Sequence, residues 1–221
     1  MGKAFTSEGS VVGIRKWHPA TMHEIDIHMP STDMGKWKTI QRIVCKVDDE
    51  GEFRDYTPGV WNAEKKVCTV FIETEHKGCG SSWANALRVG DPVIFAATHA
   101  AQLPSRPGKI ICFGDGSATG HFLALKQLAG GGQYPMEAVI FLNDEYILPA
   151  AFTAAHPEFT FVMKPHGSSL EALQQFSETK VLGDYTTIYI AGNIPMVSGL
   201  RKFFKKNPYL NARIFAHGFW S

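Results

Sequence analysis

Cysteine, long apolar runs and net charge are all scarce in this chain of 221 residues. The four cysteines, at positions 45, 68, 79 and 112, form no CxxC pair, so we expect reduced thiols rather than a disulfide framework. No stretch approaches the ~20 consecutive apolar residues that a membrane-spanning helix requires. The first residues have neither the apolar middle of a secretory signal nor the arginine-rich character of a transit peptide, so we expect a cytoplasmic protein.

The charge balance excludes two broad classes of partner. Twenty-two basic and 21 acidic side chains leave a formal charge of +1, so no overall field attracts nucleic acid or an anionic membrane surface. Hydrophobic residues make up 44% and charged residues 19%, which is typical of a globular protein and not of a disordered one. Partners must therefore be sought in local motifs.

The first hundred residues have the pattern of an antiparallel β-barrel. In residues 22–29 the polar side chains at 24, 26 and 28 alternate with Ile25, Ile27 and Met29, the period of two of a half-buried strand. Further strands are expected at 10–15, 39–47, 66–74 and 92–98, and a short helix at 82–87. Five or six strands at this spacing predict a small barrel domain over residues 1–102.

The second half alternates strands with helices. The run 101–108 contains two prolines and a glycine and predicts the connection between domains. After it, strands are expected at 109–113, 137–142, 159–163, 187–191 and 212–216, with helices at 118–128, 147–156, 169–176 and 196–204. Because parallel strands need crossover connections, residues 103–221 predict a doubly wound α/β domain with helices on both faces of a parallel sheet. Ligands usually bind at the carboxyl ends of such strands and in clefts between domains.

The run FRDYTP contains the first candidate site. In a strand, Arg54 and Tyr56 share one face, so a guanidinium group for a phosphate lies beside a ring that can stack on a planar ligand. Thr57 at the strand end offers a hydroxyl and an amide. An ordinary surface strand with an exposed arginine and a half-buried tyrosine has the same pattern.

The run HKGCGSSWANAL contains the second candidate site. Gly78 and Gly80 permit close approach to a ligand, Ser81 or Ser82 can cap the helix that follows, and the first amides of that helix attract a pyrophosphate. Glycine–serine turns also precede many short helices without binding anything.

Two glycine turns follow strands of the second domain. FGDGSATG resembles a dinucleotide fingerprint, but Thr119 stands where the third glycine belongs and Gly120 follows it. TIYIAGN repeats the arrangement, with Gly192 for close approach and Asn193 as a neutral amide. Both are candidates for one half of a pyridine nucleotide, although the second segment also fits a tight turn.

These motifs, in order and followed by the closing GFWS, resemble the siderophore-interacting proteins. That family consists of FAD-dependent NAD(P)H ferric-siderophore reductases of the ferredoxin reductase superfamily. The resemblance spans nearly the whole chain and implies FAD, with NADH or NADPH as co-substrate and a ferric siderophore as electron acceptor. It implies that Arg54, Tyr56 and Thr57 hold the flavin, with Arg54 toward the phosphate.

The resemblance also assigns residues to the other cofactor segments. The flavin pyrophosphate would lie at Gly78, Gly80, Ser81, Ser82, Trp83 and Ala84. The nucleotide would lie at Gly114, Asp115, Ser117, Ala118 and Gly192. Three positions depart from the family pattern: Gly59 replaces an arginine, Gly120 a proline and Asn193 an acid, which puts one phosphate contact and part of the nucleotide handling in question.

The expected catalysis needs no nucleophile, because the flavin would perform the chemistry. Tyr56, Thr57 and Lys46 are the catalytic candidates, with Lys46 resembling a lysine that the family places beside an anionic chelate; it also fits a solvated strand end. Trp220 either covers the flavin ring or packs the last strand. The histidines at 18, 23 and 28 alternate faces of a strand, so we expect no metal site.

Three questions remain open from the sequence. Asn143, Asp144 and Glu145 follow a strand where carboxylates favour the free ribose of NADH, but NADPH is not excluded. The protein could instead be a general flavin or electron-transfer reductase, or a binding module without flavin that carries a siderophore or docks to a partner. We expect a monomer, without nucleic acid or membrane partners.

Overall fold

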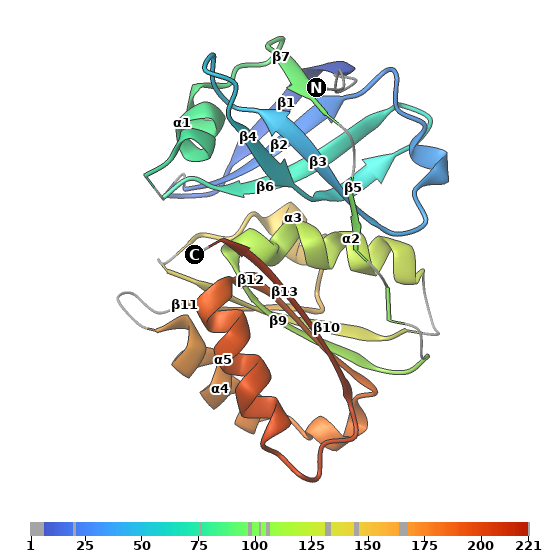
Figure 1. Ribbon diagram of the computed structural model, residues 1–221, viewed down its shortest axis with the longest axis vertical. Helices are drawn as coiled ribbons and strands as arrows, with labels where there is room; N and C mark the ends of the chain where they lie inside the picture. The colour runs from blue at the N-terminus through green and yellow to red at the C-terminus, as the bar shows by residue number, and fades with distance from the viewer. Residues whose placement is uncertain are drawn as a thin grey trace. The chain divides into compact units, whose positions relative to one another are not determined.

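The computed structural model describes residues 7–19, 21–75, 77–96, 99–101, 103–104, 107–130, 134–143, 146–163 and 168–220. The chain divides into two compact units, Met1–Leu103 with Leu123–Leu128, and Pro104–Phe122 with Ala129–Ser221 (Figure 1). The predicted boundary after Gln102 falls on a residue outside those described and stays a prediction.

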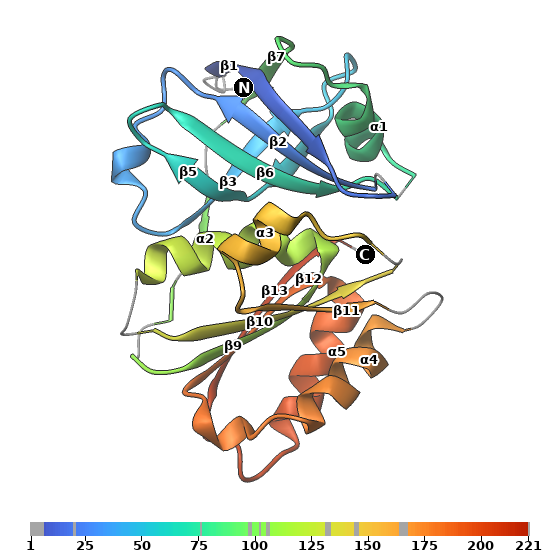
Figure 2. The same ribbon diagram turned by 180° about the vertical axis from the view of Figure 1, so that it is seen from behind.

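The first unit is built on one curled antiparallel sheet, as Figures 1 and 2 show. Its strands are β1 Ser7–Lys16, β2 Met22–His28, β3 Ile40–Lys46, β4 Phe53–Tyr56, β5 Pro58–Asn62, β6 Val67–Glu73, β7 Pro92–Phe95 and β8 His99–Ala101. They lie in the order β4-β3-β7-β1-β2-β6-β5, and β8 pairs with β3. The expected antiparallel β-class is confirmed. The sequence ranges missed β5 and β8, which have only five and three residues and therefore little room for alternation.

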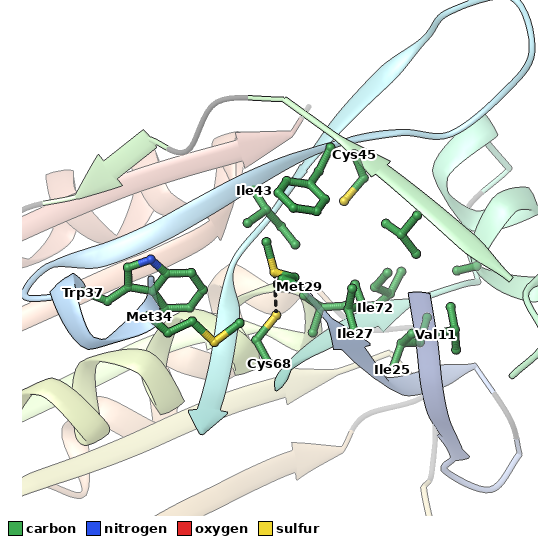
Figure 3. Packing of buried hydrophobic residues seen from close by; sticks show 14 residues of the cluster. Val11, Ile25, Ile27, Met29, Met34, Trp37, Ile43, Cys45, Cys68 and Ile72 are labelled. Carbon is green, nitrogen blue, oxygen red and sulfur yellow. Dashed lines mark hydrogen bonds between the residues drawn. The ribbon is translucent and has the colours of Figure 1, made fainter. Parts of the chain in front are cut away.

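The core of this sheet confirms the period of two in residues 22–29. Ile25, Ile27 and Met29 are fully buried and point into the cluster that Figure 3 shows, where the Cys68 thiol lies 3.5 Å from the Met29 sulfur. All four cysteines are free thiols. Burial raises the pKa of Cys45 to about 12, which keeps that thiol protonated at neutral pH.

The polar side of β2 is less exposed than the alternation predicts. Glu24 is only 9% exposed, because its carboxylate accepts hydrogen bonds from the Trp17 indole at 2.7 Å and the Arg15 guanidinium at 2.8 Å. Arg15 also binds both oxygens of Asp26, and Thr69 donates to the same carboxylate at 2.7 Å. Burial of these acids is tolerated because each is hydrogen-bonded to a charged or polar donor.

The second unit has the expected parallel sheet. Its strands are β9 Ile110–Asp115, β10 Met136–Leu142, β11 Phe159–Met163, β12 Thr187–Asn193 and β13 Arg213–Trp220. All its neighbouring strands are parallel, in the order β11-β10-β9-β12-β13. The first strand, β9, therefore lies between β10 and β12, and the strand order reverses beside it. Open α/β sheets bind ligands at the carboxyl ends of strands at such a reversal.

Helices cover both faces of this sheet. They are α2 Thr119–Ala129, α3 Ala150–Ala155, α4 Ser169–Glu178 and α5 Ile194–Lys205. Helices α4 and α5 lie side by side on one face, over a core that includes Phe113, Ile190 and Leu200. The first turn of α2 lies on the other face, where His121 is hydrogen-bonded to the Tyr189 hydroxyl at 3.0 Å.

Helix α3 is shorter than the range 147–156 predicts. Pro149 is its N-cap, and a proline disfavours helical geometry in the residue before it. The helix consequently starts at Ala150. None of the helices in the described ranges is both long and apolar enough to cross a membrane.

The second unit carries an ion-pair cluster that makes stability depend on pH. Lys109 and Lys180 each place Nζ 2.7 Å from a different oxygen of Glu137. The hydrogen bond from Lys109, followed by that from Lys180, lowers the pKa of Glu137 from 4.5 to about 2. A carboxylate with a lowered pKa stabilises the fold above its unfolded pKa and loses this contribution as the pH falls toward the folded value.

We therefore expect Glu137→Gln to lower the free energy of unfolding at neutral pH by about 1–2 kcal/mol, after allowance for solvent screening. The difference from the unsubstituted protein should shrink as the pH falls from about 5 toward 2. Urea unfolding across that range measures it, with the exposed Glu64→Gln as control. A difference that stays constant with pH would contradict the ion-pair explanation.

Candidate functional site

Arg54 and Tyr56 share one face of β4, as the sequence predicts. They lie opposite Cys45 and Ile43 of β3, and residues directly opposite in an antiparallel pair share a face of the sheet. Helix α1, Cys79–Ala86, begins against this face. A Cβ atom at Gly80 would lie 2.8 Å from the Tyr56 hydroxyl and 3.4 Å from Arg54 Cγ. The structure thus brings the two motifs of the first unit together.

Gly78 and Gly80 have different roles at the start of α1. Gly78 is the N-cap, with extended backbone and no side chain to occupy the first amides. Those amides have no acceptor within the helix and remain available to an anion. Gly80 is required for packing, because only a residue without Cβ allows the helix to approach Tyr56 so closely.

Tyr56 is held by an aromatic stack. Its ring lies 5.5 Å from the Trp83 ring at an interplanar angle of 18°, so α1 supplies both the close glycine and the stacking partner. Burial raises the pKa of the Tyr56 phenol. The hydroxyl therefore stays neutral and able to donate a hydrogen bond at physiological pH.

Arg54 presents an accessible cation next to that ring. Its side chain is 48% exposed, and its guanidinium donates to Glu52 at 3.0 Å and to the Phe53 carbonyl at 2.7 Å. An exposed pair of this kind contributes little to stability. Arg54 can therefore exchange Glu52 for a phosphate at small cost.

Other predicted residues of the first unit lie nearby in different environments. Thr57 is half-buried directly after β4, Ser81 is half-buried and Ser82 exposed in α1. Ala84 is 1% exposed and its side chain belongs to the core, so only its main chain could reach a ligand. Gly59 is buried at an irregularity in the β5–β6 pairing, the position where the family pattern has an arginine.

Lys46 is not brought together with this group. It lies opposite Phe53 in the β3–β4 pair, one residue out of phase with Cys45 and Arg54. The alternation of side chains along a strand places it on the other face from Arg54 and Tyr56. The sequence could not show this, because the register between β3 and β4 is needed to assign the faces.

The second group lies at the carboxyl ends of β9 and β12, where the strand order reverses. Asp115 is 6% exposed, and its two oxygens accept from different segments. Oδ1 accepts from the Ser117 amide at 3.1 Å and the Ser117 hydroxyl at 2.5 Å. Oδ2 accepts from the main-chain N–H of Asn193 at 2.7 Å. One carboxylate therefore joins two strand ends that are 78 residues apart in the sequence.

Both predicted glycines at this edge are explained by close packing. Gly192 has φ +128°, and a Cβ there would lie 2.6 Å from Asp115 Oδ1. At Gly114 a Cβ would lie 2.6 Å from the buried Ala118 Cβ and 2.7 Å from the Ala191 carbonyl. These contacts account for both glycines without a ligand.

Trp220 belongs to the same group. Its indole donates to the Ser117 hydroxyl at 3.1 Å, and its carbonyl lies 3.5 Å from the Asn193 amide nitrogen Nδ2. Asn193 Oδ1 also accepts from the Met196 amide and caps α5. The sequence leaves open whether Trp220 covers the flavin ring or packs the last strand. The hydrogen bond from its indole to Ser117 holds the ring at the end of that strand.

Sequence reasoning missed a polar and aromatic cluster beneath this edge. His121 is fully buried and bonded to Tyr189, and the Tyr189 ring stacks on Phe215 and His217 at 5.5 and 5.1 Å. The alternation of Phe215 and His217 in β13 could have indicated that their rings share one face of the strand. The contact with His121 could not be predicted, because it depends on how α2 lies on the sheet. Among the described residues no set of three His, Cys, Asp or Glu side chains could hold a metal.

The arrangement has the ferredoxin reductase-like fold, and comparisons with solved structures agree. The siderophore-interacting protein of Acinetobacter baumannii matches with 20% identity and a TM-score of 0.75, over 97% of this chain and 90% of that chain. The siderophore-interacting protein SipS of Aeromonas hydrophila matches with 12% identity and 0.74, over 98% and 92%.

A ferredoxin NADP+ reductase of Neisseria gonorrhoeae with bound FAD and NADP matches with 17% identity and 0.70, over 98% of this chain and 100% of that chain. No protein-family model and no curated protein matches the sequence. The predicted resemblance to siderophore-interacting proteins is therefore confirmed in the fold.

The two glycines of α1 provide a matched pair of substitutions. Gly80→Ala forces Tyr56 or the helix to move, and we expect it to lower the free energy of unfolding by about 1–2 kcal/mol. Gly78→Ala meets nothing within 4 Å and should cost only the poorer N-cap preference of alanine, about 0.5 kcal/mol. Urea unfolding of both variants measures the difference, and equal effects would show that Gly80 does not limit the approach of α1.

Proposed function

We propose that the protein is a flavin reductase that transfers electrons from NADH or NADPH through FAD to a ferric siderophore and releases Fe(II). The observation that carries the proposal is the β4–α1 group, in which the Arg54 guanidinium, the Tyr56 ring and the first amides of α1 lie together. The shared fold of siderophore-interacting proteins and flavin reductases supports it.

The residues present fit FAD. A pyrophosphate needs a cation and free amides, and Arg54 and the start of α1 supply both on one face. An isoalloxazine needs a flat apolar surface with hydrogen-bonding groups at its rim. Tyr56, backed by Trp83, and the hydroxyl of Thr57 supply these.

When bound, FAD supplies the acceptance of a hydride from a nicotinamide and the release of its electrons one at a time to Fe(III). The protein's own residues bind and orient. Arg54 neutralises phosphate charge, Gly80 and Ser81 donate amides, and the neutral Tyr56 hydroxyl donates a hydrogen bond without adding charge next to the ring. Trp83 stacks on one side of Tyr56 and so fixes the orientation of its ring.

The nucleotide would bind at the carboxyl edge of β9 and β12. Gly114, Ser117, Ala118 and Gly192 all lie there, as strand ends at a reversal of strand order require. Asn143 follows β10 and is exposed, whereas Asp144 and Glu145 lie outside the described residues. We retain NADH and NADPH as equal candidates, and we place the protein in the cytoplasm as a monomer.

The cofactor and the electron acceptor can be identified by absorption and turnover. The purified protein, supplemented with FAD, should show a flavin absorption spectrum that bleaches anaerobically with NADH or NADPH and recovers when a ferric siderophore is added. Turnover with ferric chelates should exceed turnover with free flavins or quinones by at least about tenfold. Faster turnover with flavins or quinones would favour a general reductase, and a protein that binds no FAD would favour a binding module.

Arg54 is the residue of the β4–α1 group whose loss should weaken FAD binding most directly. Arg54→Ala removes a charge-assisted contact of about 1.5–3 kcal/mol, so FAD affinity should fall about 10- to 100-fold. Arg88→Ala removes the same charge from an exposed position just past the other end of α1 and serves as the control. Titration of apoprotein with FAD, followed by flavin fluorescence, measures both, and unchanged affinity in Arg54→Ala would exclude the β4 assignment.

A further inference from the structure

The Asp115 carboxylate, although predicted to bind the nucleotide, is already engaged by the chain. Its oxygens accept from the Ser117 amide, the Ser117 hydroxyl and the Asn193 amide at 2.5–3.1 Å. Gly192 packs directly against this carboxylate, so that a Cβ atom at position 192 would collide with it. Asp115 is 6% exposed, and three of the about four acceptor positions of its carboxylate are taken by the chain, so it offers a ligand little surface.

Two successive hydrogen bonds connect Asp115 to Trp220 through the Ser117 hydroxyl. The Ser117 hydroxyl has one proton, and the short contact with Asp115 Oδ1 requires that Ser117 donate it there. Its lone pairs then face outward, and the Trp220 indole donates to them at 3.1 Å. Asp115 therefore fixes the orientation in which the Ser117 hydroxyl accepts from Trp220.

Asn193 gives a second route to the same residue. The main-chain N–H of Asn193 donates to Asp115 Oδ2. This bond fixes the main chain at the point where the pairing of β12 with β13 shifts register, between Gly192 and Asn193. From that position Asn193 faces Trp220 across the pair, and its side chain reaches the Trp220 carbonyl. The ends of β9, β12 and β13 are thus joined through one acid.

We propose that Asp115 is a positioning residue that does not contact the nucleotide. It holds the turn after β9 and the end of β12, and it fixes Trp220 at the nucleotide-binding edge, the indole through Ser117 and the main chain through Asn193. The role in nucleotide binding rests on the proposed function; the effect on Trp220 does not.

The direct test follows the indole N–H of Trp220 by ¹⁵N NMR in the full-length protein, with its signal assigned by its loss in Trp220→Phe. In Asp115→Asn the new amide cannot accept from both Ser117 and Asn193, so the Trp220 signal should shift and its proton should exchange with solvent at least about tenfold faster. Ser117→Ala should give the same shift and the same faster exchange. Ser117→Thr keeps a hydroxyl and should leave the Trp220 signal close to that of the unsubstituted protein.

The indole of Trp17 is the internal control, since it donates to Glu24 in the other compact unit. Its signal should stay in place in every variant, which distinguishes loss of the Asp115 contact from unfolding. If the Trp220 signal is unchanged in both Asp115→Asn and Ser117→Ala, the proposal is wrong.

A binding titration with NADH and with NADPH, read from the same spectra, tests the consequence for the nucleotide. Asp115→Asn and Ser117→Ala should each weaken binding by about tenfold, and the double variant should be no worse than Asp115→Asn alone, because both act on one path. Additive losses would show that Asp115 and Ser117 act on the nucleotide independently and would overturn the positioning role through Ser117. If the unsubstituted protein binds neither nucleotide, the proposed function fails while the indole result stands by itself.

Discussion

The parallel sheet of this protein is organised at its carboxyl edge by one buried carboxylate. Parallel strands arrive at that edge from separate crossovers, and nothing in the ladder itself fixes the chain once the strands end. Asp115 supplies the missing constraint, because it accepts from the main chain of the turn that follows it and from the main chain of the last residue of β12. The glycines at 114 and 192 are then obligatory, since larger residues would push these segments apart.

The β4–α1 group follows the same physical logic in the other unit. There the constraint is steric: α1 approaches β4 so closely that only glycine fits at position 80, and the approach places Trp83 over Tyr56. A rigid aromatic pair and a set of helix amides are thereby built from eight helical residues and a four-residue strand. Neither element would be stable alone, so the geometry depends on the sheet to which both are attached.

Local periodicity predicted most of the fold, because each prediction needed only a few consecutive residues. The alternation at Ile25 and Ile27 identified β2, and the strand–helix rhythm after residue 108 identified the parallel sheet. The shared face of Arg54 and Tyr56 followed in the same way. What could not be predicted required registers or strand neighbours: the face of Lys46 depends on the β3–β4 register, and the contact between Asp115 and Asn193 depends on β9 lying beside β12.

The departures from the family pattern are better understood as matched to their surroundings than as isolated losses. At position 59 the chain is buried in an irregular stretch of the β5–β6 pair, where an arginine would have to leave the core to reach a phosphate. At position 193 an acid would place a second negative charge beside Asp115 and would lack a donor for the Trp220 carbonyl. Asparagine avoids that repulsion, and its amide serves both the start of α5 and the last strand. A neutral amide at 193 is therefore suited to the carboxylate at 115, whereas an acid at 193 would meet that charge without gaining a partner.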